Sequence, residues 1–338
     1  MKLRLLAALA LVCALSSSAV AEPIILRFAT AAPDGTAWAR LFRAMGRDIE
    51  SDSKGALTAK WYFGGIAGSE LETLERLKKN QLDGVMSGGP LCMKLSPSMQ
   101  ALRLIGLYQS RAEAAYVLGR LRPTVDREIT EAGFHNVGVA MLGPDVLFTR
   151  TPVTSVAELR KTRLWVWDSD PAMLAQFAAI GVPTAGMGVE RAASAYEEKR
   201  IDGFLSVPTA ALAFQWSAAT KSLVELRLGY LPGCMVMSER VWDTLDVDER
   251  AAVNAGLAKF DARLEDLGRH QDAELLGGLF ERQGLKRVTI SPAFATEFMA
   301  LAKSARDALR DKLLSGALID RISGWLNDYR AEHHEPRN

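Results

Sequence analysis

The sequence predicts an α/β protein whose strands run parallel in a sheet that helices cover. Short apolar runs with strand character alternate along the chain with stretches of helical length, which is the pattern of βαβ units. Hydrophobic residues make up 49% of the 338 residues, so an ordinary apolar core can hold the fold without a framework of disulfides. The length that follows an N-terminal leader suits two domains of ordinary size.

Each expected element has its own local signal. Strands are short runs of apolar and β-branched residues, and helices are bounded by capping residues, glycine or proline. The expected strands cover residues 24–30, 56–63, 82–89, 137–142, 146–149, the part of 160–171 that holds Trp165, 201–207, 223–228, 233–237 and 288–290. The expected helices cover residues 37–51, 111–131, 172–180, 190–199, 209–216, 292–312 and 318–331. A further helix follows Ser69, which forms a capping-box pattern with Glu72.

Residues 247–282 form the longest helical stretch. These 36 residues contain no proline and consist mostly of good helix formers. At 1.5 Å per residue an unbroken helix would be roughly 50 Å long, which is longer than one small domain. Gly256, Gly268, Gly277 and Gly278 allow breaks within it.

Residues 1–21 are predicted to be a signal peptide that is cleaved after Ala21. Lys2 and Arg4 precede the apolar run 5–15, and Ala19-Val20-Ala21 is a small-x-small cleavage pattern. Without Lys2 and Arg4 the chain keeps 39 basic and 40 acidic side chains, a net charge near −1. This balance does not suggest nucleic acid as a partner, and no later run approaches the length of a membrane span. We therefore expect a protein exported to the periplasm.

The reactive residues do not form a catalytic or metal-binding pattern. The four histidines lie outside any zinc-protease or nucleophile-elbow context, and no Cys/His spacing matches a metal site. The glycine-rich turn at 64–69 lacks the Lys-Ser/Thr of a phosphate-binding loop. Cys92 and Cys234 could form a disulfide, which the sequence leaves open. We expect a binding protein without a cofactor rather than an enzyme.

Two tryptophans mark the most informative strand. Side chains alternate along a strand, so Trp165 and Trp167 should share one face, roughly 7 Å apart. They lie near the C-terminal end of that strand, where open α/β sheets bind ligands. Core packing and ligand contact are both open interpretations at this point.

An ordered set of short motifs resembles a known family. The motifs are Leu26-Arg27-Phe28-Ala29, Phe63-Gly64-Gly65 with Gly68-x-Glu70, Leu82-Asp83, residues 155–160, Gly181-Val182-Pro183-Thr184 with Met187 and Glu190, Ile201-Asp202-Gly203, and Val241-Trp242-Asp243-Thr244-Leu245. In this order they resemble the periplasmic solute receptors of tripartite ATP-independent periplasmic (TRAP) transporters, the DctP-type family. The resemblance covers nearly the whole chain after the leader.

The resemblance implies a two-lobed periplasmic-binding-protein fold with a long helix bracing both lobes. It places the ligand between the lobes. We expect residues 22–147 and 236–282 in the first lobe, and residues 148–235 and 283–330 in the second. Residues 331–338 are expected to be a disordered tail.

The sequence departs from the family where the family holds its ligand. Most members carry an arginine on the central strand that pairs with the carboxylate of an organic acid, and Trp165 occupies that position here. An indole favours an apolar or uncharged ligand, since a buried carboxylate without a cation costs several kcal/mol. A variant branch that lacks the arginine has a hydrophobic cleft and is linked to a helical-repeat partner protein. The stretches Trp165-Val166-Trp167 and 208–216 resemble that branch.

We therefore expect a hydrophobic or amphipathic small-molecule ligand, passed to TRAP permease subunits or to a helical-repeat periplasmic partner. The predicted ligand-binding residues are Trp165, Trp167, Trp38, Phe204, Pro208, Met86, Ser87, Met187, Trp216, Met235 and Arg150. Phe214 is equally compatible with core packing and with ligand contact. The alternative is an ordinary organic-acid receptor that uses Arg150 or Arg163.

Overall fold

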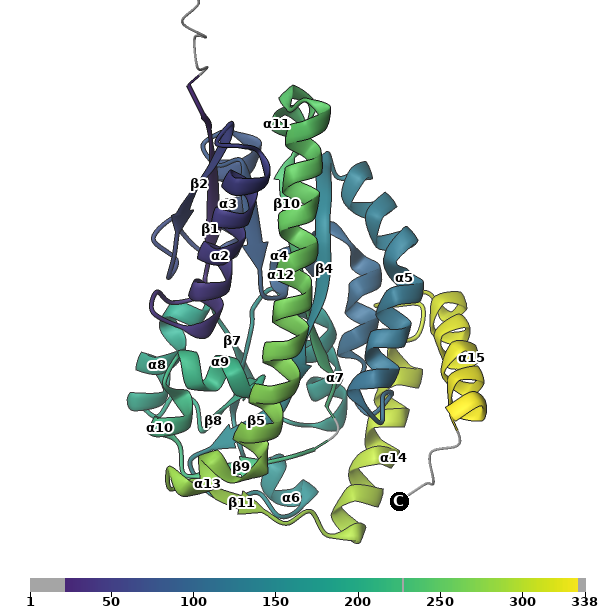
Figure 1. Ribbon diagram of the computed structural model, residues 1–338. Helices are drawn as coiled ribbons and strands as arrows, with labels where there is room; N and C mark the ends of the chain where they lie inside the picture. The colour runs from purple at the N-terminus through teal and green to yellow at the C-terminus, as the bar shows by residue number, and fades with distance from the viewer. Residues whose placement is uncertain (1–21, 227, 334–338) are drawn as a thin grey trace, which may run out of the picture.

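The computed structural model describes residues 22–226 and 228–333. The expected signal peptide and residues 334–338 of the expected tail lie outside these ranges. The described residues form two lobes, each a sheet with helices packed on it, as Figure 1 shows. None of their helices is long and apolar enough to cross a membrane.

The first lobe is built on a sheet with the strand order β2-β1-β3-β10-β4. Its strands are β1 (Ile24–Thr30), β2 (Leu57–Tyr62), β3 (Gly84–Ser87), β4 (Phe134–Pro144) and β10 (Tyr230–Ser238). Its helices are α2 (Ala37–Asp52), α3 (Glu70–Lys78), α4 (Pro90–Leu95), the 3₁₀ helix η1 (Pro97–Arg103), α5 (Arg111–Glu131) and α11 (Glu239–Thr244). Strands β1, β2 and β3 are parallel, but β10 is antiparallel to β3 and β4. The sheet is therefore mixed rather than parallel as predicted.

The second lobe is built on a sheet with the order β11-β9-β5-β8-β6-β7. Its strands are β5 (Val146–Thr149), β6 (Leu164–Val166), β7 (Thr184–Gly186), β8 (Gly203–Ser206), β9 (Ser222–Val224) and β11 (Lys286–Val288). Its helices are α6 (Val156–Leu159), α7 (Pro171–Ile180), α8 (Val189–Glu197), α9 (Pro208–Ala213), α10 (Trp216–Ala219), α13 (Phe280–Arg282) and α14 (Pro292–Leu309). Strand β6 is parallel to β7 and β8, whereas β5 is antiparallel to β8 and β9.

Helix α12 (Val247–Glu274) runs along both lobes (Figure 1). It begins at a capping box made by Asp246 and Glu249, and it packs on α2 and β4 of the first lobe and on α9 of the second. It continues into the π-helix η2 (Leu275–Leu279), where Gly278 has a φ of 121°. Only glycine adopts that conformation readily, so the helical stretch breaks there. The sequence had allowed a break at this glycine.

Four segments differ from the expected lobe boundaries. Val146 and Leu147, expected in the first lobe, belong to β5 of the second sheet, because the chain crosses between the sheets at Asp145. Helix α13, also expected in the first lobe, packs in the second, where Phe280 contacts Phe148. Residues 230–235, expected in the second lobe, belong to β10 in the first sheet, because this apolar strand is buried between β3 and β4. Helix α15 (Gly316–His333) packs on α5 of the first lobe and includes residues 331–333 of the expected tail.

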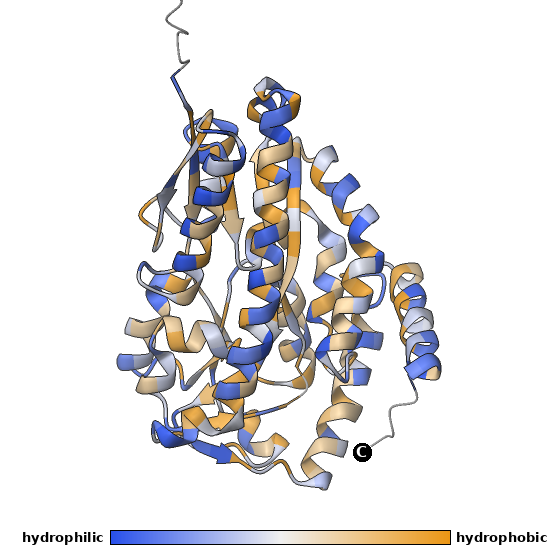
Figure 2. Cartoon of the chain, in the orientation of Figure 1, coloured by the Kyte–Doolittle hydropathy of each residue, from blue (hydrophilic) through white to orange (hydrophobic). Residues whose placement is uncertain are grey.

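Helices α4 and η1 were not predicted. They occupy residues 90–103, where prolines and serines obscure any hydrophobic period. Figure 2 shows hydrophilic and hydrophobic residues interleaved along the helices, as expected of helices that pack one face on a sheet.

A buried ion cluster joins the lobes. The guanidinium of Arg103, at the end of η1, pairs with Asp145 at the crossing and with Asp170, the N-cap of α7. The Arg103 Nη2 to Asp170 Oδ2 distance is 2.9 Å, and the three residues are 1%, 2% and 0% exposed. Burial raises the pKa of Asp145 to about 6, although Arg103 opposes the shift. The cluster therefore fixes three distant segments at one point.

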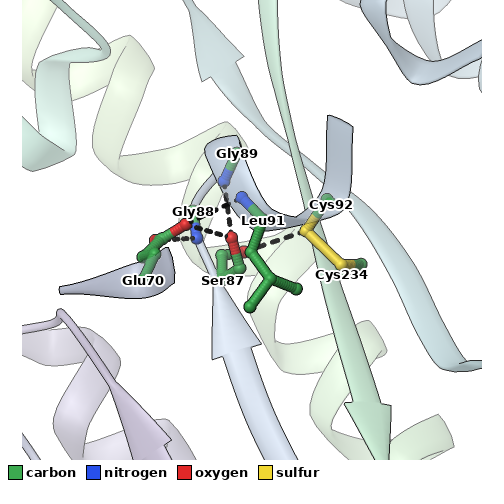
Figure 3. The surroundings of a disulfide bond; sticks show 7 residues. All are labelled: Glu70, Ser87, Gly88, Gly89, Leu91, Cys92 and Cys234. Carbon is green, nitrogen blue, oxygen red and sulfur yellow. Dashed lines mark hydrogen bonds between the residues drawn. A yellow bond between two sulfur atoms is a disulfide. The ribbon is translucent and has the colours of Figure 1, made fainter. Parts of the chain in front are cut away.

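A disulfide links α4 to β10. Cys92 and Cys234 are bonded across a sequence separation of 142, with their Cα atoms 5.6 Å apart (Figure 3). Both are buried. The bond holds α4, which follows β3, against β10 of the first sheet.

We predict that replacing both cysteines with serine lowers the free energy of unfolding by about 2–5 kcal/mol, because the unfolded chain loses a cross-link that closes a long loop. Chemical denaturation of the oxidised protein measures the change. A reductant should destabilise the native protein and leave the double variant unaffected. Equal sensitivity of both proteins to reductant would contradict the prediction.

We predict that Arg103→Met destabilises the protein by about 3–5 kcal/mol, because two buried carboxylates lose their cation. Urea denaturation measures this loss. The control is Arg127→Met, which removes an arginine 65% exposed in a surface pair with Glu131 and should change stability by less than about 0.5 kcal/mol. Similar losses in the two variants would show that the cluster is energetically unimportant.

Candidate functional site: the cleft between the lobes

The C-terminal ends of four strands face the space between the lobes. Thr30 ends β1 and Ser87 ends β3 in the first sheet, while Trp167 follows β6 and Val207 follows β8 in the second. These residues line two adjoining cavities. Ligands of open α/β sheets bind at such strand ends, so the position agrees with the rule used for the sequence.

The larger cavity spans about 780 Å³ of space, which includes open solvent. The first lobe contributes residues of β1, α2, β3, β4 and β10, and the second contributes Trp167, Ala210 and Phe214. The aromatic residues that line it are Trp38, Phe42, Trp167, Phe214 and Phe260.

Helix α12 forms one side of this cavity. Leu257, Phe260, Asp261 and Leu264 follow a spacing of i, i+3, i+4 and i+7, which places them on one helix face. The ring of Phe260 stacks on Phe42 of α2 with centroids 5.2 Å apart. The bracing helix therefore supplies part of the site as well as connecting the lobes.

Glu70 is a buried carboxyl at the first-lobe side of the cavity (Figure 3). It accepts a hydrogen bond from the Ser87 hydroxyl and from the amides of Gly88 and Leu91, at 3.0 and 3.2 Å for the two amides. Burial raises its pKa, and these hydrogen bonds oppose the shift. With the neighbouring disulfide, Glu70 holds the loop that follows β3 in one conformation.

The smaller cavity, about 300 Å³, lies beside β6, the strand that contains Trp165. Trp165, Trp167 and Trp216 line it together with Phe214, Arg103 and Asp145. Trp165 is 1% exposed, and its indole Nε1 donates to the Met187 carbonyl at 3.1 Å. Its ring centroid is 5.1 Å from that of Trp167 and 4.9 Å from that of Trp216. Trp167 and Phe214 line both cavities.

The predicted site residues fall into three groups. Those that line the larger cavity are Trp38, Met86, Ser87, Trp167 and Met235. Trp165 and Trp216 line the smaller cavity. Phe204, Pro208 and Met187 are buried and line neither. Phe204 stacks on Trp216 with ring centroids 4.7 Å apart, so it packs against a residue that lines the smaller cavity.

Arg150 and Arg163 lie away from both cavities. Arg150 follows β5, which is antiparallel to β8, so it lies beside the start of β8. Its guanidinium carbon is 3.8 Å from the centroid of the Tyr196 ring, and it donates to the Tyr196 carbonyl. Arg163 precedes β6 and is exposed. Both therefore lie at the sheet edge opposite the strand ends, and neither lines a cavity.

The sequence analysis did not identify Phe42, Phe260, Asp261 or Arg103 as site residues, and it used Glu70 only as part of a motif. The face of α12 could have been found, since its apolar residues repeat at helical spacing. No local sequence pattern identifies Arg103 as a site residue, because its partners Asp145 and Asp170 are 42 and 67 residues away in sequence.

Comparisons with solved structures support the fold. A sugar acid binding protein from Advenella mimigardefordensis, in complex with galactonate, has a TM-score of 0.84 and 16% identity, covering 91% of this chain and 99% of that chain. A TRAP periplasmic solute binding protein from Haemophilus influenzae with bound L-gulonate has a TM-score of 0.82 and 15% identity, covering 90% and 99%. An extracytoplasmic solute receptor from Bordetella pertussis, which binds pyroglutamic acid, has a TM-score of 0.80 and 18% identity, covering 90% and 98%.

A comparison with curated proteins gives no significant match. The family described as bacterial extracellular solute-binding protein, family 7, matches residues 28–312. This match spans most of the chain and confirms the DctP-type resemblance found in the motifs, as the solved structures confirm the two-lobed α/β fold. The chain belongs to bacterial extracellular solute-binding protein family 7, the DctP family.

Proposed function

We propose that this protein is a periplasmic receptor of a TRAP-type transport system and that it captures a hydrophobic or amphipathic small molecule between its lobes. It passes this molecule to TRAP permease subunits or to a helical-repeat periplasmic partner. Family membership supports the receptor role. The hydrophobic character of the ligand rests on the cavity.

The lining of the larger cavity is the observation that carries the proposal. Most of its residues are aromatic or aliphatic, and none of the described residues that line it is lysine, arginine or histidine. Burying an organic carboxylate there would cost several kcal/mol without a cation. Covering an indole can contribute up to about 4–6 kcal/mol, which favours an apolar ligand body.

The second candidate is an organic-acid receptor. It is favoured by the solved structures with the same fold, which hold galactonate, L-gulonate and pyroglutamic acid. Of the arginines considered, Arg150 and Arg163 lie outside the cavities. Arg103 lines the smaller cavity, but its guanidinium already forms ion pairs with Asp145 and Asp170. The chain therefore offers a carboxylate no comparable partner in the described cleft.

We predict that 1-octanol raises the melting temperature of the purified protein and that galactonate does not, because only the alcohol avoids burying an unpaired carboxylate. Differential scanning calorimetry at matched concentrations measures both shifts. Native mass spectrometry adds a direct test, since a closed apolar cleft retains lipid through purification. A large shift with galactonate alone would overturn the proposal in favour of the organic-acid receptor.

We predict that Trp167→Ala weakens octanol binding by about tenfold, or 1.4 kcal/mol, because the indole lines both cavities. Isothermal titration calorimetry measures the Kd. The matched control is Trp325→Ala, since Trp325 packs on the first-lobe core beside Arg120, away from the cleft. Equal affinity in Trp167→Ala and the native protein would remove Trp167 from the site.

A further inference from the structure

The ionisable side chains among the described residues that line the larger cavity are all acidic. Its described lining contains two ionisable side chains, Glu70 and Asp261, and both are carboxyl groups. The remaining polar lining comes from hydroxyl groups and the backbone. A ligand that enters this cavity therefore meets negative charge and aromatic rings.

Glu70 and Asp261 differ in the hydrogen-bond partners of their carboxyl oxygens. The oxygens of Glu70 accept three hydrogen bonds from the loop after β3. Among the described residues, the groups that act on Asp261 include no hydrogen-bond donor, and the only opposing charge is that of Arg122. Burial raises the pKa of Asp261 to about 6, and the charge of Arg122 on α5 opposes this shift. Asp261 is thus a half-buried carboxyl whose oxygens have no protein partner.

The cations nearest in sequence to Asp261 are already paired elsewhere. Lys259 of α12 lies 2.8 Å from an oxygen of Asp52, and Arg263 pairs with Asp48, both on α2. Lys259 and Arg263 are largely exposed, whereas Asp261 shares the cavity face with Phe260 and Leu264. Lys259 and Arg263 therefore pair with α2, whereas Asp261 lines the cavity.

Aromatic faces complete the arrangement. Five rings line the same cavity as Asp261: Trp38, Phe42, Trp167, Phe214 and Phe260. The faces of tryptophan and phenylalanine attract ligand cations within about 6 Å, most strongly where water is excluded, and such rings recognise quaternary ammonium groups. A carboxyl and several rings around an apolar cavity form a combination that suits a positive head group on an apolar body.

We propose that the ligand of this cleft is a cationic amphiphile, an amine or quaternary ammonium whose positive group lies against Asp261 and the aromatic rings. Its apolar part lies along Met86, Leu142 and Met235. This inference rests on the proposed function, since it specifies the head group of the amphipathic molecule that the cleft takes.

The test compares three probes that share one tail: octyltrimethylammonium, 1-octanol and octanoate. Isothermal titration calorimetry at pH 8, where Asp261 is ionised, measures the three Kd values. We expect the ammonium probe to bind at least tenfold more tightly than octanoate, with octanol between them. Asp261→Asn should weaken ammonium binding at least fivefold and narrow the difference between the ammonium and octanol Kd values. Asp261→Lys should reverse the order of the two charged probes.

The control is Asp266→Asn, which removes the same charge from an exposed position of α12 that does not line the cavity. It should leave all three affinities unchanged. Equal binding of the three probes, or an ammonium affinity that Asp261→Asn does not change, would overturn the inference that the ligand has a cationic head group. Neither result would contradict the proposal that the protein is a receptor for an apolar ligand. Failure of every octyl probe, together with binding of galactonate, overturns the proposed function itself.

Discussion

The buried ion cluster around Arg103 is the constraint on which the two-lobed arrangement depends. It joins the end of η1, the crossing between β4 and β5, and the start of α7. Gln176 strengthens the junction, because its side chain accepts from the Ile105 amide at 2.7 Å and donates to the Arg103 carbonyl at 3.0 Å. A buried charge is tolerated only when its partners are in place, so these segments must meet in one geometry. The smaller cavity lies directly against this cluster.

The bracing helix has two roles that follow from its length and its sequence. Its residues Gly256 and Val253 pack towards the first lobe. A Cβ added at Gly256 would lie 2.6 Å from the Ile49 side chain, so glycine allows the close approach of the helix. One turn further on, Phe260 and Asp261 reach the cleft. Because a single rigid element carries both the lobe contact and the cavity lining, the position of Asp261 is linked to the packing of the first lobe.

The fold and the ligand chemistry are separate properties of this family. Solved proteins 15–18% identical to this chain keep the same fold and hold sugar acids or pyroglutamic acid. This chain keeps that architecture, and the described residues that line its larger cavity include two carboxyl groups and no lysine, arginine or histidine. A few side chains on a fixed scaffold are enough to set the charge of a site, so the fold alone does not identify the ligand.

The sequence by itself determined the local structure and the family. The Ser69–Glu72 capping box of α3 and the strand at residues 146–149 were both predicted, because such signals act between residues a few positions apart. Only the tertiary structure decided that β10 joins the first sheet, that Cys92 bonds to Cys234, that Arg150 contacts Tyr196 outside both cavities and that Asp261 lines the larger one. These outcomes depend on the direction of each strand and on contacts between segments distant in sequence, which no local pattern specifies.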